Sequence, residues 1–339
     1  MDVKRHISWY TPRIRQISLA EILEIRNLKK YYVKKKIFSS KSSVVKAADD
    51  VTFSIKKGEV FVLAGESGSG KTTIAKLILK SIQADSGKII FESQEIDEQK
   101  KNLQKIRMNC QMIHQDPYDS INPRMKIKDI ISEPLEIHNT GNKEQRMKRV
   151  MEVLQEVKLE PAKEIIQKYP HMLSGGQRQR VVLARALALK PKIIIADEPV
   201  SMLDVSIRAE MLELMKQLQT KYNISFIYIT HDLATAKYFG QRIAILYLGK
   251  IVETGPINQV LESPKHPYTQ ALIDAISEPD PNNIHKIREI RIKETTGKDI
   301  SKGCRFKPRC PYAIKQCDVE PDLEKVCDKH FSACYVKLD

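Results

Sequence analysis

Short apolar runs alternate with helical patterns along most of the chain. The runs EVFVLAG (59–65), KIIIAD (192–197) and NISFIYITHD (223–232) have the length and composition of buried parallel strands. Between the last two runs, apolar residues recur at helical spacing: Ile207, Met211, Leu214 or Met215, and Leu218. Strands that alternate with helices in this way predict an α/β domain with a mostly parallel sheet.

Two other patterns flank these strands. Residues 23–32 and 46–59 alternate like antiparallel strands, whereas residues 97–172 are mostly helical and charged. The signals of a core fade after GKIVETGP, at about residue 256, and SPKHPYTQALIDAI then begins an appended segment. We therefore expect four parts: a basic N-terminal segment (1–20), a main domain (21–256), a helical insert within it (about 97–190) and a C-terminal extension (257–339).

The charge of the 339-residue chain is uneven. Of the net charge of +15, residues 1–46 contribute twelve Lys/Arg against three Asp/Glu, or +9. Such a segment attracts nucleic acid or an anionic membrane surface, and it is equally compatible with a solvated surface. There is no run of ~20 apolar residues that would span a bilayer, and the N-terminus lacks the apolar region of a signal peptide. These features predict a protein that stays in the cytosol.

A phosphate-binding loop follows the first buried strand. GESGSGKTT matches the pattern GxxxxGK[ST], and the helical pattern TTIAKLILKSI continues from it. Glycines let the backbone wrap phosphates, Lys71 reaches the β- and γ-phosphate oxygens, and the Thr72 hydroxyl is suited to bind Mg²⁺. The predicted nucleotide-binding residues of the loop are Gly65, Glu66, Ser67, Gly68, Ser69, Gly70, Lys71, Thr72 and Thr73.

Acidic and histidine side chains follow the other two buried strands. Asp197 ends the strand in IIIADEP, where it is placed to hold Mg²⁺, and Glu198 is placed to deprotonate the water that attacks the γ-phosphate. Two adjacent acids at a strand end can also be ordinary surface charges. His231 follows the third strand, at the sheet edge where ligands of open α/β sheets bind. We predict that it contacts the γ-phosphate, although single histidines at strand ends are more often structural.

A second glycine turn, LSGGQ (173–177), begins another helical pattern. Free N–H groups and the helix dipole make such a turn suitable for a phosphate. If its helix packs on the helical insert, the turn points away from the phosphate loop of its own chain. It then needs a nucleotide from another subunit, which predicts two chains arranged head to tail.

The motifs GESGSGKT, LSGGQRQR, IIIADEP, SMLD and ITHD resemble, in order and spacing, the nucleotide-binding subunit of an ABC ATPase. The resemblance implies a P-loop ABC ATPase fold with a RecA-like core, an antiparallel β subdomain and a helical subdomain. It also implies that Gln115 touches Mg²⁺ and faces a membrane partner, and that Tyr32, or its neighbour Tyr31, stacks on adenine. Residues expected to act on the nucleotide of the opposite subunit, or between the two sites, are Ser174, Gly175, Gly176, Gln177, Ser201, Leu203 and Asp204; Met202 departs from the usual alanine or asparagine.

Longer stretches are similar to the ATPase subunits of oligopeptide and dipeptide importers. They are QDPYDSINPRM, DEPVSMLDVSIRAE and SPKHPYTQALIDAI. The resemblance implies a peripheral ATPase on the cytoplasmic side of the membrane that binds ATP and Mg²⁺. Its implied partners are a second ATPase subunit (a similar chain or a copy of itself), two permease subunits and an extracytoplasmic peptide receptor. The alternatives are a nickel or sugar importer, or a soluble ATPase acting on ribosomes or nucleic acid; we expect no nucleic acid partner, because one P-loop and one LSGGQ are present.

Five of the six cysteines lie near the C-terminus, spaced C-x₅-C-x₆-C-x₉-C-x₆-C. In a chain with no export signal, such a cluster favours metal over disulfides. The resemblance implies a 4Fe-4S cluster on Cys304, Cys310, Cys317 and Cys334. Cys327 competes with Cys334 as the fourth ligand, His330 is another possible ligand, and zinc or a metal-free tail are the alternatives.

Overall fold

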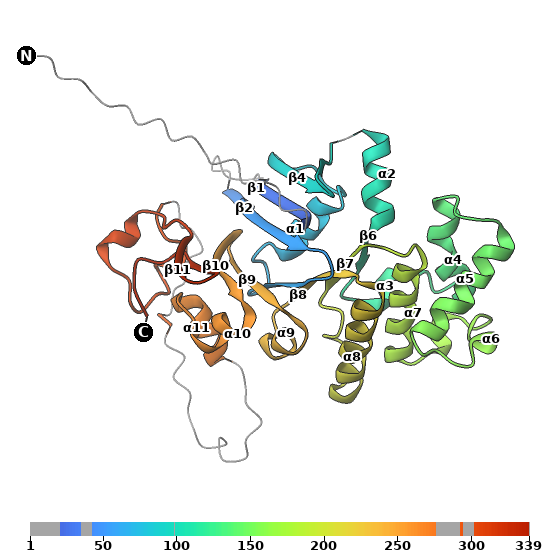
Figure 1. The fold of residues 1–339 in the computed structure, drawn as a ribbon. Coiled ribbons are helices and arrows are strands. Elements are labelled where there is room, and N and C mark those ends of the chain that lie inside the picture. The colour runs from blue at the N-terminus through green and yellow to red at the C-terminus, as the bar shows by residue number, and fades with distance from the viewer. Residues whose placement is uncertain (1–20, 35–42, 98, 276–291, 294–301, 339) are drawn as a thin grey trace, which may run out of the picture.

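The computed structural model describes residues 21–34, 43–97, 99–275, 292–293 and 302–338, so the basic segment 1–20 lies outside the described residues. Figure 1 shows the arrangement. The strands are β1 (Glu21–Lys34), β2 (Ser43–Lys56), β3 (Val60–Ala64), β4 (Ser86–Phe91), β5 (Gln94–Glu95), β6 (Cys110–Ile113), β7 (Ile193–Asp197), β8 (Ser225–Thr230), β9 (Arg242–Tyr247), β10 (Lys250–Pro256), β11 (Glu324–Cys327) and β12 (His330–Ser332). The helices are α1 (Lys71–Ile78), α2 (Lys100–Asn109), α3 (Pro117–Ser120), α4 (Ile127–Ile137), α5 (Lys143–Glu156), α6 (Ala162–Ile165), α7 (Gly175–Ala188), α8 (Val205–Tyr222), α9 (Leu233–Phe239), α10 (Ile257–Glu262) and α11 (Pro267–Asp274).

The main sheet has the order β11-β12-β10-β9-β3-β8-β7-β6. Its central strands β9, β3, β8, β7 and β6 are parallel, and β10, β12 and β11 extend it antiparallel. Every residue of β3, β7 and β8 is buried, because both faces of the sheet are covered. In β3, Val62 packs into the core on one face and Phe61 into the core on the other. The α/β domain and its three predicted strands are therefore confirmed.

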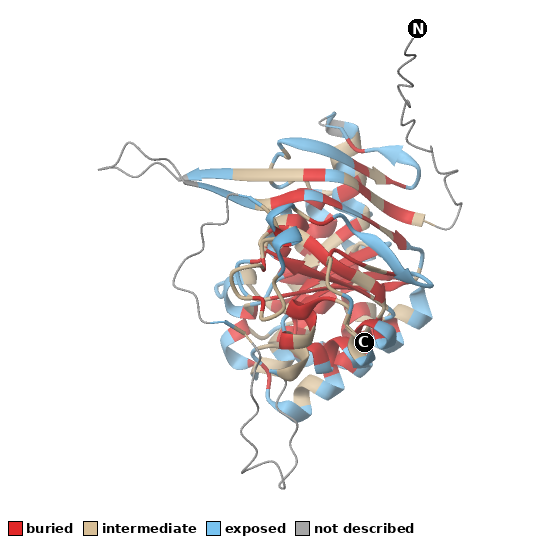
Figure 2. Cartoon of the chain, turned by 90° about the vertical axis from the view of Figure 1, so that its left-hand side faces the viewer, coloured by how far each residue is buried: buried red, intermediate tan, exposed pale blue. Residues whose placement is uncertain are grey.

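A second sheet, with the order β2-β1-β4-β5, is antiparallel. The long β1–β2 hairpin pairs as the alternating patterns predicted, and its far end is exposed (Figure 2). Leu23, Ile25 and Ile55 of this sheet are fully buried and share one core with α1 and one face of the main sheet. The hairpin is thus anchored at the start of β1 and the end of β2, and Ala47, farther along β2, lies against Gly70 of the phosphate loop.

The helical region lies at the β6–β7 edge of the main sheet, where α7 contacts α3, α4 and α5 (Figure 1). Helix α5 begins with a capping box, in which Asn142 and Gln145 satisfy each other's backbone N–H groups. The predicted insert at about 97–190 contains β6, which the sequence pattern did not show and which pairs with β7. The boundaries at residues 20, 97, 190 and 256 stay predictions.

The C-terminal residues pack against the end of the main sheet. Strand β12 pairs with β10, and β11 pairs with β12. The buried Glu253 accepts hydrogen bonds from the backbone N–H groups of Lys265 and His266 and lies 2.7 Å from His330 Nε2, which ties this region together. Within the described part of the chain, no helix is long and apolar enough to cross a bilayer.

Candidate functional site

The phosphate loop connects β3 to α1 at the carboxyl end of the parallel strands. Gly65 and Gly70 have φ angles of +148° and +111°, and a methyl group on Gly70 would lie 1.9 Å from the carbonyl oxygen of Ala47. Only glycine fits such positions without strain. Lys71 Nζ donates to the carbonyl oxygens of Gly65 (2.7 Å) and Glu66 (2.9 Å). The loop therefore holds a cation at its centre, as a phosphate site requires.

The environment of Lys71 is buried and partly acidic. Burial lowers the pKa of Lys71, and the negative charges of Glu198, Asp197 and Glu66 oppose this shift. Burial raises the pKa of Asp197, and the hydrogen bond from Thr72 Oγ1 to Asp197 Oδ2 (2.8 Å) opposes that rise. The hydroxyl and the carboxylate predicted to hold Mg²⁺ are thus brought together by β7 and α1, and this pair of hard oxygen donors fits that ion.

Glu198 is placed at the centre of a group of three predicted catalytic side chains. Gln115 Nε2 donates to Glu198 Oε2 (2.9 Å), and His231 Nδ1 lies 2.8 Å from Glu198 Oε1. The Glu198 side chain is only 13 % exposed, and its backbone N–H donates to the carbonyl of Ile229 on β8 (2.9 Å). The structure therefore places one carboxylate between an amide and an imidazole at the edge of the sheet.

An open cleft of about 1100 Å³ joins these groups. Tyr32 lines it together with Gln115, Asp197, Glu198 and His231, and with the loop residues Gly65, Glu66, Ser67, Gly68, Gly70, Lys71, Thr72 and Thr73. Buried Ser69 is the one loop residue that does not line it. The cleft is large enough for a nucleoside triphosphate.

The two neighbouring tyrosines have different surroundings. Tyr32 is 41 % exposed at the cleft, whereas the hydroxyl of Tyr31 donates to Asp49. Burial works against the charge of Asp49, but hydrogen bonds from Tyr31, Lys46 and Arg305 lower its pKa to about 2. Of the two candidates for stacking on adenine, only Tyr32 is thus available in the cleft.

The LSGGQ turn forms the start of α7. Ser174 Oγ accepts from the N–H of Gln177 (3.3 Å), and Gln177 Oε1 accepts from the N–H of Ser174 (3.0 Å), which makes a capping box. Gly175 has open space around it, while a methyl group on Gly176 would meet Ile207. The described residues that line the cleft do not include 174–177, nor Asp204 at the start of α8. The structure therefore does not bring these predicted residues to the cleft of their own chain.

Comparison with known proteins identifies the family. The model of the family described as ABC transporter matches residues 48–201, and that described as oligopeptide/dipeptide transporter, C-terminal region, matches residues 252–317. The oligopeptide transport ATP-binding protein AppF of Bacillus subtilis is 40% identical over 321 residues, which cover 93% of this chain and 97% of AppF. The chain belongs to this family of ABC transporter ATP-binding proteins. Like its family, it is an ATPase that uses ATP and Mg²⁺.

Other relatives agree with this assignment. OppF of the same organism, also an oligopeptide transport ATP-binding protein, is 46% identical over 265 residues, which cover 77% of this chain and 84% of OppF. Among solved structures, the dimeric bacterial ABC transporter cassette MJ0796 has a TM-score of 0.61 at 30% identity and covers 69% of this chain and 98% of its own. The P-loop ABC ATPase fold is therefore confirmed, and the family implies a dimeric ATPase that works with transmembrane permease subunits.

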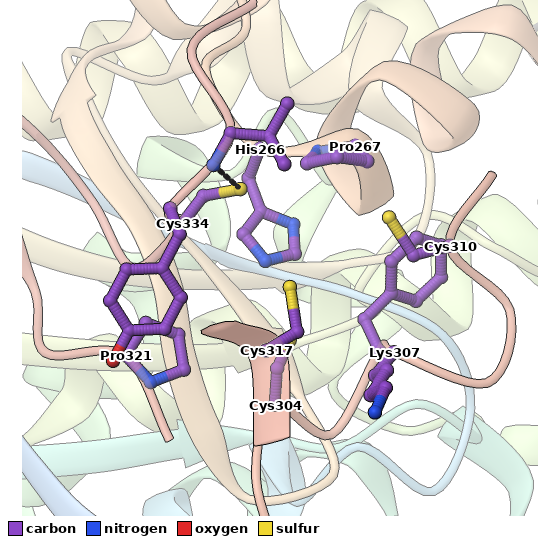
Figure 3. A pocket seen from close by; sticks show the side chains of 11 residues that line it. His266, Pro267, Cys304, Lys307, Cys310, Cys317, Pro321 and Cys334 are labelled. Carbon is purple, nitrogen blue, oxygen red and sulfur yellow. Dashed lines mark hydrogen bonds between the residues drawn. The ribbon is translucent and has the colours of Figure 1, made fainter. Parts of the chain in front are cut away.

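The structure contradicts the predicted iron–sulfur cluster at the C-terminal cysteines. Cys304, Cys310, Cys317 and Cys334 line one small cavity of about 10 Å³ (Figure 3), which is about the room that one water molecule needs. Cys327 is exposed on β11, and His330 pairs with Glu253 rather than pointing at a metal. In the described ranges no group of three or more His, Cys, Asp or Glu side chains is arranged to hold a metal ion.

Burial changes the pKa of three of these thiols. Burial raises the pKa of Cys304 and Cys310, and it raises the pKa of Cys334 to about 11. Cys334 Sγ accepts a hydrogen bond from the N–H of Val336 (3.4 Å). The iron–sulfur prediction is contradicted because no group of described side chains is arranged to hold a metal ion.

Sequence reasoning missed two residues at the phosphate loop. Arg309 donates to both carboxylate oxygens of Glu66 at 2.9 Å, and the hydroxyl of Tyr268 accepts from the N–H of Glu66 at 2.8 Å. Tyr268 lies within the HPYT segment that marked the importer resemblance, so its position was visible, but its contact was not. No local pattern marks Arg309, because its partner is 243 positions away.

Proposed function

We propose that this chain is the ATP-hydrolysing subunit that drives peptide uptake through a membrane ABC importer. The observation that carries the proposal is the Glu198 group beside an intact phosphate loop, in a chain whose C-terminal region matches the oligopeptide/dipeptide type. AppF and OppF, whose names describe oligopeptide transport, support the choice of peptide as cargo.

In this proposal the side chains of the cleft divide the work of hydrolysis. Lys71 binds the β- and γ-phosphates, and Thr72 and Asp197 would hold Mg²⁺, which when bound offsets phosphate charge. Glu198 accepts a proton from the attacking water, because it is the carboxylate at the γ-phosphate end of the loop. His231 and Gln115 hold Glu198 in position from either side, and Tyr32 stacks on the adenine.

A second ATPase subunit completes the site in this proposal. The LSGGQ turn begins α7 with open space at Gly175 and lies outside the cleft of its own chain, so a partner's turn would cover the nucleotide. The dimeric MJ0796 cassette is a precedent for such pairing. Asp204 and its neighbours Ser201 and Leu203 would lie between the two sites. The partner is either a second copy of this chain or a similar ATPase.

The remaining parts of the importer lie outside this chain. Gln115 is placed between the catalytic group and α3, so it would pass closure of the dimer to two permease subunits at the cytoplasmic face of the membrane. An extracytoplasmic receptor would deliver the peptide. Closure driven by ATP and reversed by hydrolysis converts binding energy into a change of transporter conformation.

Vesicles that contain this ATPase together with two permease subunits and a peptide receptor of the importer provide the test. We expect ATP-dependent uptake of labelled peptides that disappears with Glu198→Gln but persists with Glu262→Gln, a change at an exposed acid that pairs with Lys237. Uptake of nickel or sugar instead of peptide would contradict the cargo. ATP hydrolysis stimulated by RNA or ribosomes and indifferent to permease vesicles would contradict the transporter itself.

A further inference from the structure

Glu66 is held at both its backbone and its side chain by residues of the C-terminal extension (257–339), called the C-terminal part below. Its carboxylate oxygens each accept from the Arg309 guanidinium at 2.9 Å, and its N–H donates to Tyr268 at 2.8 Å. The partners lie 202 and 243 positions away along the chain. Glu66 is the second residue of the phosphate loop, and its carbonyl accepts from Lys71. One loop residue thus joins the C-terminal part to the lysine that binds phosphate.

The Arg309 side chain is itself well fixed. Its guanidinium lies over the rings of Phe306 (5.6 Å) and Tyr247 (5.8 Å), and the Phe306 ring is fully buried. The Tyr247 and Tyr268 rings pack together at 4.5 Å. The hydrogen bonds that Arg309 donates to Glu66 and Tyr247 raise the pKa of Arg309 further above its usual range. A planar guanidinium held in this way is preorganised for two parallel bonds to a carboxylate.

The electrostatics of the loop explain why such a partner is useful. Glu66 lines the cleft in which the triphosphate binds, and an uncompensated carboxylate there would repel the phosphates. The positive charge of Arg309, which belongs to the C-terminal part, compensates the charge of that carboxylate. The loop is also rich in glycine, with φ of +79° at Gly68 and +111° at Gly70, so fixing Glu66 reduces the conformational freedom that would be lost on binding.

We propose that Arg309 is a positioning residue for ATP binding: through its paired contact with Glu66, the C-terminal cysteine-bearing part preorganises and electrically compensates the phosphate loop. The proposal concerns ATP affinity and does not depend on the cargo. The C-terminal part, whose family match carries the transporter name, thereby acts on the nucleotide site as well.

Steady-state ATPase kinetics and binding of a fluorescent ATP analogue to the full chain test this. Arg309→Gln is expected to raise KM and the dissociation constant about three- to fivefold, the effect of losing a partly exposed charge pair, with kcat unchanged. Arg309→Lys, which keeps the charge, should recover part of the affinity. The matched control is Lys250→Gln, because the Lys250–Glu320 pair (3.0 Å) has similar exposure and also joins the C-terminal part to the sheet, but does not touch the loop.

A double-mutant cycle separates positioning from general damage. In Glu66→Gln the carboxylate charge is absent, so adding Arg309→Gln should change KM little further. The proposal is overturned if Arg309→Gln leaves KM at the native value, if Lys250→Gln raises KM equally, or if the Arg309 effect is undiminished in the Glu66→Gln background. Thermal unfolding without nucleotide verifies that each variant is folded.

Discussion

Replacement of Glu198 by glutamine removes the proposed general base while leaving its surroundings nearly intact. The carboxylate has two partners, Gln115 Nε2 at 2.9 Å and His231 Nδ1 at 2.8 Å. Glutamine has the same shape and keeps one oxygen, so one of these contacts persists. The expected loss of stability is about 1 kcal/mol, the usual net value of one hydrogen bond.

The effect on the rate should be much larger than the effect on stability. A positioned general base contributes about 10²- to 10⁴-fold, which corresponds to about 3 to 5 kcal/mol in the barrier. The amide cannot accept the proton of the attacking water. Because Lys71 donates to the loop carbonyls rather than to Glu198, the phosphate-binding groups remain in place. ATP binding should therefore survive while hydrolysis is lost.

Phosphate release by the purified chain measures the rate, and fluorescence of an ATP analogue measures binding. Glu262→Gln is the matched control, because Glu262 is 64% exposed in its pair with Lys237 and does not line the cleft. We expect a drop of at least about 100-fold for Glu198→Gln and none for the control. If Glu198→Gln hydrolysed ATP at the native rate in a pure homodimer, Glu198 could not be the base.

The other predictions concern the loop, the stability at low pH and the dimer. Gly70→Ala should abolish analogue binding and lower the urea-derived stability by about 1–3 kcal/mol, because the methyl group would lie 1.9 Å from Ala47 O. Burial lowers the pKa of His266 to about 3, whereas the unfolded chain takes up a proton below about 6.5. The free energy of unfolding should therefore fall as the pH drops from 6.5 towards 3. His266→Asn keeps an acceptor for the N–H of Tyr268 and should lose less unfolding free energy than the native chain between pH 7 and pH 5, as measured by urea titration. An equal loss in the two proteins would contradict this. Ser174→Arg should retain ATP binding but lose the ATP-dependent dimer in size-exclusion chromatography, and a persisting dimer would contradict the head-to-tail arrangement.

Much of the nucleotide site was predictable because its groups follow short, contiguous apolar strands. Strands β3, β7 and β8 are parallel neighbours, so the residues after each strand meet at one edge of the sheet. That rule brings together Lys71, Asp197, Glu198 and His231 without knowledge of any side-chain contact. Gln115 follows β6, the strand whose pattern was hidden within a mostly helical stretch, so its place relied on the resemblance alone.

The choice between Tyr31 and Tyr32 could not be made from the pattern. Adjacent residues of a strand point to opposite faces, so one tyrosine had to face the cleft and the other to face away. Which face is which depends on the register of β1 against β2 and on the position of Asp49, which takes the hydroxyl of Tyr31. The local sequence determines neither the strand register nor the position of Asp49.

The cysteines and Arg309 show two different limits of prediction from the local sequence. The resemblance implied that four cysteines come together, and they do line one cavity, but the described side chains are not arranged to hold a metal ion. Arg309 precedes Cys310, and no local pattern distinguishes it from the other cations of a basic chain. Its importance follows from Glu66, which the fold brings from 243 positions away. Long-range charge pairing is decided by packing, because Arg309 meets the carboxylate of Glu66 only after the two distant segments have folded against each other.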